Sequence, residues 1–118
     1  MREVLLIFVF QIFVAVVTEA ALIALSLGAA SRLKAHAQLP MQWQLDGTVT
    51  KMAPRRFALA FTPILTVFVL AAMVALSAVT EPRPGQAWML IPVTLFVGLT
   101  AVGAHAFHLC MMSKLLRS

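Results

Sequence analysis

The sequence predicts an all-α integral membrane protein: three transmembrane helices, with a structured loop between the first and second. Hydrophobic residues make up 62% of the 118 positions, charged residues only 11%, and tyrosine is absent. This balance is typical of a chain whose main solvent is lipid. Three apolar stretches also reach the about 20 residues that a helix needs to cross ~30 Å of hydrocarbon. Residues 1–118 are therefore predicted to form a single transmembrane domain.

The predicted spans cover residues 4–27, 57–79 and 87–112. The first stretch could alternatively be a cleaved signal peptide, because Ala35-His36-Ala37 has the small-x-small pattern of a cleavage site. Its apolar run is longer than the roughly 7–15 residues of a signal core, so we expect a retained span. The single cysteine, Cys110, lies in the third span and cannot form an internal disulfide.

The basic residues predict an orientation. Seven of the nine Lys and Arg residues lie in the first loop or the C-terminal tail: Arg32, Lys34, Lys51, Arg55, Arg56, Lys114 and Arg117. The opposite side holds Arg2 and Arg83. The positive-inside bias therefore places the first loop and the C-terminus in the cytoplasm and the N-terminus outside. The same cations would also attract anionic lipid headgroups.

The first loop, residues 39–56, is predicted to be ordered. Asp46-Gly47 is a strong turn signal. Before this turn, Trp43 lies in a stretch where apolar residues alternate with two glutamines, which indicates a short extended segment. We expect that segment to lie on the membrane surface or on the helices, although a solvated linker would also fit the composition.

Part of this loop carries a motif that can be aligned without gaps to P-x-H-[WF]-[NQ]-x-[DN]-G-x-P-D-[RK]-[WY]-G-[SP]-[KR]. The matching residues are Pro40, Trp43, Gln44, Asp46, Gly47, Lys51, Pro54 and Arg55. The motif resembles the signature of the bacterial SdpI-type membrane proteins, where it also follows a first transmembrane helix and precedes a second. The chain departs from the signature at Gln42, Val49, Thr50, Met52 and Ala53.

The resemblance implies a small bacterial integral membrane domain, in a family whose role is largely unknown. SdpI-like proteins are implied to act in immunity to a secreted toxic peptide and in membrane sequestration of a transcriptional repressor. For this chain it implies a multi-pass protein of the bacterial inner (cytoplasmic) membrane that acts through protein–protein binding.

Three ionisable side chains fall well inside the spans: Glu19, His105 and His108. Such groups are costly in hydrocarbon and normally face other helices or a cavity. Counting from the predicted ends of their spans puts Glu19 and His105 at similar depth, which predicts a contact between spans one and three. The contact could be interhelical glue or part of a proton relay or cation site. His105 and His108, one turn apart, are weak candidates for metal ligands.

Small residues predict where the spans pack. Ala20, Ala24 and Gly28 form a small-xxx-small stripe on the first span. On the third span, small and polar residues follow a three-four spacing: Thr94, Gly98, Ala101, His105 and His108. Close approach of helix backbones is expected along these stripes, within the chain, between copies, or against a larger membrane complex.

No phosphate-binding loop, nucleophile–base–acid set or zinc-ligand spacing is recognisable, and no aromatic-interleaved basic groove is present. We therefore predict a non-enzymatic protein with no cofactor and no nucleic-acid partner. Its expected partners are the lipid bilayer and another membrane protein or a second copy. The alternatives are an accessory or structural subunit of a larger membrane complex, and a small transporter or proton-relay unit that uses Glu19 and His105.

Overall fold

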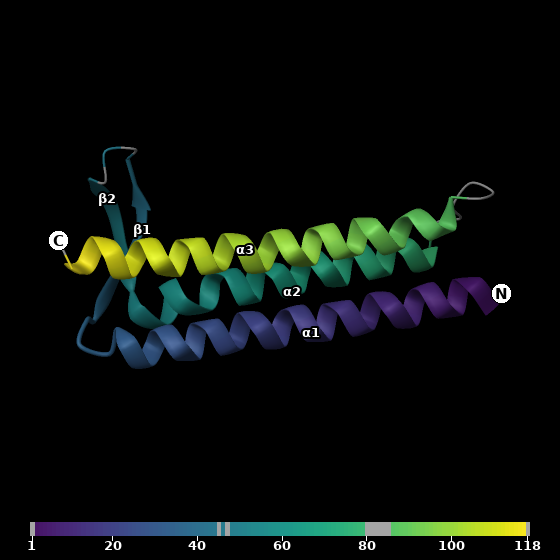
Figure 1. Cartoon of the computed structure of the whole chain (residues 1–118), viewed down its shortest axis with the longest axis horizontal. Coiled ribbons are helices and arrows are strands. Elements are labelled where there is room, and N and C mark those ends of the chain that lie inside the picture. The colour runs from purple at the N-terminus through teal and green to yellow at the C-terminus, as the bar shows by residue number, and fades with distance from the viewer. Residues whose placement is uncertain (1, 45, 47, 80–85, 118) are drawn as a thin grey trace.

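The computed structural model describes residues 2–44, 46, 48–79 and 86–117. Its elements are, in order, α1 (Arg2–Arg32), β1 (Gln38–Trp43), β2 (Val49–Pro54), α2 (Arg55–Val79), the 3-10 helix η1 (Ala87–Met89) and α3 (Leu90–Arg117). The three long helices lie side by side, and the hairpin and the C-terminus share one end of the bundle (Figure 1). Each predicted span falls in a helix that is long and apolar enough to cross a membrane.

The helices extend beyond the predicted spans. α1 continues to Arg32, α2 already begins at Arg55, and α3 continues to Arg117. At about 1.5 Å per residue, the 31 residues of α1 measure roughly 46 Å, against ~30 Å of hydrocarbon. The end turns are polar but still helical, because the backbone hydrogen bonds of a helix do not depend on apolar side chains. Arg83 lies outside the described residues.

The structured loop is an antiparallel β-hairpin, so the all-α prediction is incomplete. β1 pairs with β2 from Gln38–Pro54 to Trp43–Val49, with irregular register on either side of Gln42. The extended segment predicted around Trp43 is β1. Its partner β2 was not predicted, because Val49–Pro54 has no apolar alternation to distinguish it from a linker.

α1 is the helix that holds the bundle together. It packs along both α2 and α3, which contact each other only slightly. Its buried residues are three, four or seven residues apart, so that one stripe of the helix faces its neighbours. These residues are Ile7, Gln11, Val14, Thr18, Leu22 and Ala29.

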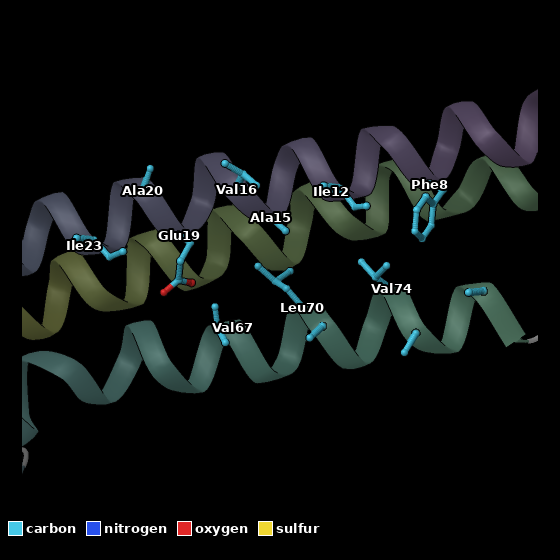
Figure 2. Close-up of a pocket in the computed structure, with 13 residues that line it drawn as sticks. Phe8, Ile12, Ala15, Val16, Glu19, Ala20, Ile23, Val67, Leu70 and Val74 are labelled. Atoms are coloured by element: carbon cyan, nitrogen blue, oxygen red, sulfur yellow. The ribbon is translucent and has the colours of Figure 1, made fainter.

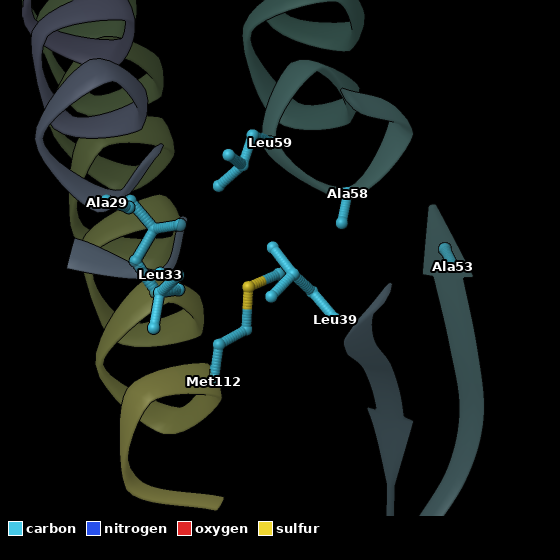
Figure 3. Packing of buried hydrophobic residues seen from close by; sticks show 8 residues of the cluster. Ala29, Leu33, Leu39, Ala53, Ala58, Leu59 and Met112 are labelled. Carbon is cyan, nitrogen blue, oxygen red and sulfur yellow. The ribbon is translucent and has the colours of Figure 1, made fainter. Parts of the chain in front are cut away.

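At the hairpin end, β1 occupies the space between α2 and α3. Leu39 is fully buried there and meets Leu33, the residue after α1, Leu59 of α2 and Met112 of α3 in one apolar cluster (Figure 3). Ala53 of β2 belongs to the same cluster. The part of the hairpin around Leu39 and Ala53 therefore belongs to the hydrophobic core, whereas most of its other residues are exposed.

α1 and α3 pack closely at Gly98. A Cβ atom at this position would lie 2.7 Å from the Thr18 hydroxyl oxygen and 3.5 Å from Val14 Cγ1. Gly98, which was predicted to pack between helices, lies against Thr18 and Val14 of α1. Gly103, one and a half turns along the same helix, has open space beside it.

We predict that Leu39→Ala lowers the free energy of unfolding by about 2–5 kcal/mol, since it leaves a cavity where three helices and the hairpin meet. Reversible unfolding in mixed micelles measures the change. Leu99→Ala is the matched control, because Leu99 is 72% exposed on α3. Equal effects of the two substitutions would mean that the hairpin is not anchored in the core.

We predict that Gly98→Ala costs about 1–3 kcal/mol of stability, because the new methyl group forces α1 and α3 apart against a stiff, β-branched Thr18. Gly103→Ala should be nearly neutral or stabilising in the same unfolding assay. Adding Thr18→Ala to Gly98→Ala should recover part of the loss. A Gly98→Ala protein as stable as the Gly103→Ala protein would contradict the close contact.

Candidate functional site

An apolar groove runs along the face where α1 meets α2. Its volume is about 810 Å³, and Ile12 and Val16 of α1 face Val67 and Val74 of α2 across it. Apart from Glu19, its lining consists of alanine and larger apolar side chains. This size lies within the range of about 300–1,000 Å³ that is usual for ligand sites in proteins.

Glu19 is the ionisable residue in the groove lining. Its side chain points from α1 towards α2, near Val67 and Leu70 (Figure 2). The Glu19 Oε2 atom is buried, and no described residue forms a hydrogen bond with it. An acidic or basic group at mid-helix costs of order 2.5–3.5 kcal/mol on insertion scales. The groove therefore contains a buried carboxyl oxygen that has no hydrogen-bond partner among the described residues.

The predicted contact between Glu19 and His105 is not what the structure forms. His105 Nε2 lies 2.7 Å from the hydroxyl of Ser26, two helical turns, or roughly 10 Å, beyond Glu19 along α1. Counting from the predicted span ends misjudged the relative depth of the helices, which the contact between Thr18 and Gly98 sets instead. Each helical residue also rotates about 100°, so Glu19 faces α2 while Thr18 faces α3.

Ser26 connects all three helices at the hairpin end. Its hydroxyl donates to the carbonyl of Leu59 in α2 at 2.7 Å, which uses its only proton. The 2.7 Å contact with His105 therefore requires that His105 Nε2 carries the proton and donates it to Ser26 Oγ. His105 is 1% exposed, so this hydrogen bond between α1 and α3 is shielded from solvent.

A second polar cluster, missed in the sequence, ties the helices near the opposite end. Gln11 of α1 donates from Nε2 to Ser77 of α2 at 3.2 Å and to Thr94 of α3 at 3.3 Å. Both hydroxyls donate their own protons to the carbonyls one turn earlier, Met73 and Leu90, and so remain acceptors for Gln11. The sequence did contain a signal for this cluster. Gln11 is an uncharged amide among apolar residues, and its spacing puts it in phase with the buried stripe of α1.

His108 faces the hairpin. Its ring centroid lies 5.1 Å from that of Trp43 at a tilt of 48°, and it also interacts with the Pro40 carbonyl. The two histidines proposed as weak metal ligands thus contact different partners. Among the described residues, no group of three or more His, Cys, Asp and Glu side chains could hold a metal ion. Cys110 is exposed.

Several residues of the signature loop are involved in hydrogen bonds that hold the loop in place. The Arg55 guanidinium donates to the Ala30 carbonyl at the end of α1, where the helix dipole favours a cation. The backbone N–H of Arg55 donates to the Ala37 carbonyl at 2.9 Å. The Thr48 amide donates to Asp46 at 2.9 Å and lowers the pKa of that carboxyl below its ordinary value. Gly47 lies outside the described residues.

The remaining signature residues and the small residues of the α1 stripe are exposed or only partly buried. Gln44, Lys51 and Pro54 are exposed. In the stripe, Ala20 and Ala24 are exposed and Gly28 is partly buried, so it does not pack against α2 or α3 as closely as Gly98 packs against α1. Ala101 is half-buried. The small residues of α1 and α3 therefore differ: Gly98 joins helices of this chain, whereas Ala20 borders the open groove.

No protein-family model, no curated protein and no solved structure matches this chain. Membership of the SdpI-type family thus stays a prediction from the loop residues, and the function must be inferred from the geometry of the groove and the hairpin.

Proposed function

We propose that this chain is a non-enzymatic membrane protein that binds another polypeptide within the bilayer, along the groove between α1 and α2. The observation that carries the proposal is the buried and unpartnered Glu19 oxygen in an otherwise apolar lining. Ionisable groups inside membranes normally pair with a partner. An intramembrane binding role also agrees with the protein–protein binding implied by the loop's resemblance to SdpI-type proteins.

The hairpin supports this role indirectly. By filling one end of the bundle between α2 and α3, it joins two helices that otherwise contact each other only slightly. A groove between helices held in this way is largely preformed, which reduces the entropy lost on binding. The partner could be a secreted peptide, a regulatory protein or a subunit of a larger complex, and all three would occupy the same groove.

We predict that a photo-crosslinking amino acid in place of Ile12 or Val67 captures one discrete polypeptide, in the cells that naturally produce the protein. The same probe in place of Leu99, which faces away from the helix contacts, should capture lipid and no discrete polypeptide. The adducts are resolved by gel electrophoresis and mass spectrometry. Equal adducts from the groove and from Leu99 would refute a binding role of the groove.

A matched pair of variants sharpens this assay. Ala71 lines the groove, and its neighbour Ala72 is exposed outside it. Ala71→Leu should reduce the Ile12 adduct at least fivefold because the larger side chain fills the groove, whereas Ala72→Leu should leave it unchanged. A loss with both variants would point to misfolding, and their unfolding curves would identify it.

We also propose that the hairpin end faces the cytoplasm. The described cations at that end include Arg32, Lys34, Lys51 and Arg56, and the positive-inside bias favours the cytoplasm for such a cluster. The hairpin and the end of α3 lie together at this end, opposite the start of α1 (Figure 1).

We predict that, with Cys110→Ser as background, Thr50→Cys in the hairpin reacts with a membrane-impermeant maleimide only after the cells are permeabilised. Glu3→Cys, exposed at the opposite end, should react in intact cells. Mass-tag labelling on gels measures both reactions. The reverse pattern would invert the orientation and place the hairpin outside.

A further inference from the structure

We propose that the occupant of the groove is a transmembrane helix of another protein that carries a lysine or arginine at the depth of Glu19. This inference rests on the proposed binding function and adds the chemistry of the partner. Three observations support it: the unpartnered carboxyl oxygen of Glu19, the small side chains around it, and the positions of the Lys and Arg residues in this chain.

The carboxylate needs a donor that the described residues do not supply. Glu19 Oε2 is buried, and the residues that share the groove with it are apolar. A lipid acyl chain could fill the space, but it has no hydrogen-bond donor. Since ionisable side chains inside membranes pair with one another, a cationic side chain is the complement of Glu19.

The groove is shaped for a helix backbone to approach closely. Alanines line it on both sides, with Ala15 and Ala20 on α1 and Ala71 and Ala75 on α2. Small residues are enriched where transmembrane helices pack, because they let backbones come near enough for extensive van der Waals contact. A helix seated there would bring its side chains next to Glu19.

A second copy of this chain does not offer the required charge. In the described helices, the Lys and Arg residues lie in the end turns: Arg2, Arg32, Arg55, Arg56, Lys114 and Arg117. Glu19 lies near the middle of α1. None of the Lys and Arg residues in the described helices of a second copy would therefore lie at the depth of Glu19, which points to a different protein.

The test uses the full-length protein in phosphatidylcholine vesicles, with a fluorescent donor on its single cysteine, Cys110, which is exposed. The probes are acceptor-labelled, Leu/Ala-rich transmembrane peptides that differ at one central residue, which is Lys, Gln or Leu. We expect energy transfer to show at least tenfold tighter binding of the Lys peptide than of the Leu and Gln peptides. Glu19→Gln should abolish this preference.

Glu3→Gln is the matched control, because it removes the same charge from the exposed first turn of α1. It should keep the preference for the Lys peptide. Equal binding of the three peptides, binding of none, or an unchanged preference in Glu19→Gln would each overturn the inference. A natural partner that crosslinks from the groove but has no cation in its membrane span would overturn it while leaving the proposed function intact.

Discussion

The close packing of α1 against α3 at Gly98 is the contact on which the rest of the bundle depends. With no side chain at Gly98, the third helix comes near enough to touch Thr18, and this contact fixes the register of the two helices. The same register brings Gln11 to Thr94 on one side of the contact and Ser26 to His105 on the other. The polar contacts therefore follow from backbone proximity, since each would be lost if the helices slid by one turn.

Two polar clusters and one apolar cluster then secure the helices in different ways. Gln11 and Ser26 each contact both other helices, so α1 is held at two levels. Hydrogen bonds of this kind contribute only about 0.6 kcal/mol on average inside membranes, so their main effect is on alignment. The hairpin cluster around Leu39 contributes apolar packing at the end where α2 and α3 would otherwise be separated.

The groove between α1 and α2 results from this arrangement, and the proposed function rests on it. Because Thr18 is directed to α3, the next residue, Glu19, is rotated towards α2, where Leu70 and Val67 surround it with apolar surface. Gln11 and Ser26 thus form helix contacts within the chain, whereas Glu19 Oε2 has no hydrogen-bond partner among the described residues. The proposed partner would supply the hydrogen-bond donor that this oxygen lacks among the described residues.

The sequence by itself determined the three spans, the ordered loop and the identity of the intramembrane ionisable residues. These properties depend on composition and local pattern, because a run of about 20 apolar residues is sufficient to predict a span and Asp46-Gly47 is sufficient to predict a turn. Gly98 was also predicted to be a packing residue, since small residues have few other uses in the middle of an apolar helix.

Only the tertiary structure decided the partner of each polar group. Whether His105 meets Glu19 or Ser26 depends on a shift of two turns between helices that are far apart in sequence, and counting from span ends cannot resolve such a shift. The strand β2 likewise exists because β1 offers it a hydrogen-bonding edge, although its own residues show no strand pattern. The sequence determines the local propensity for helix or turn, but the register of the helices and the pairing of the strands depend on which surfaces fit together in three dimensions.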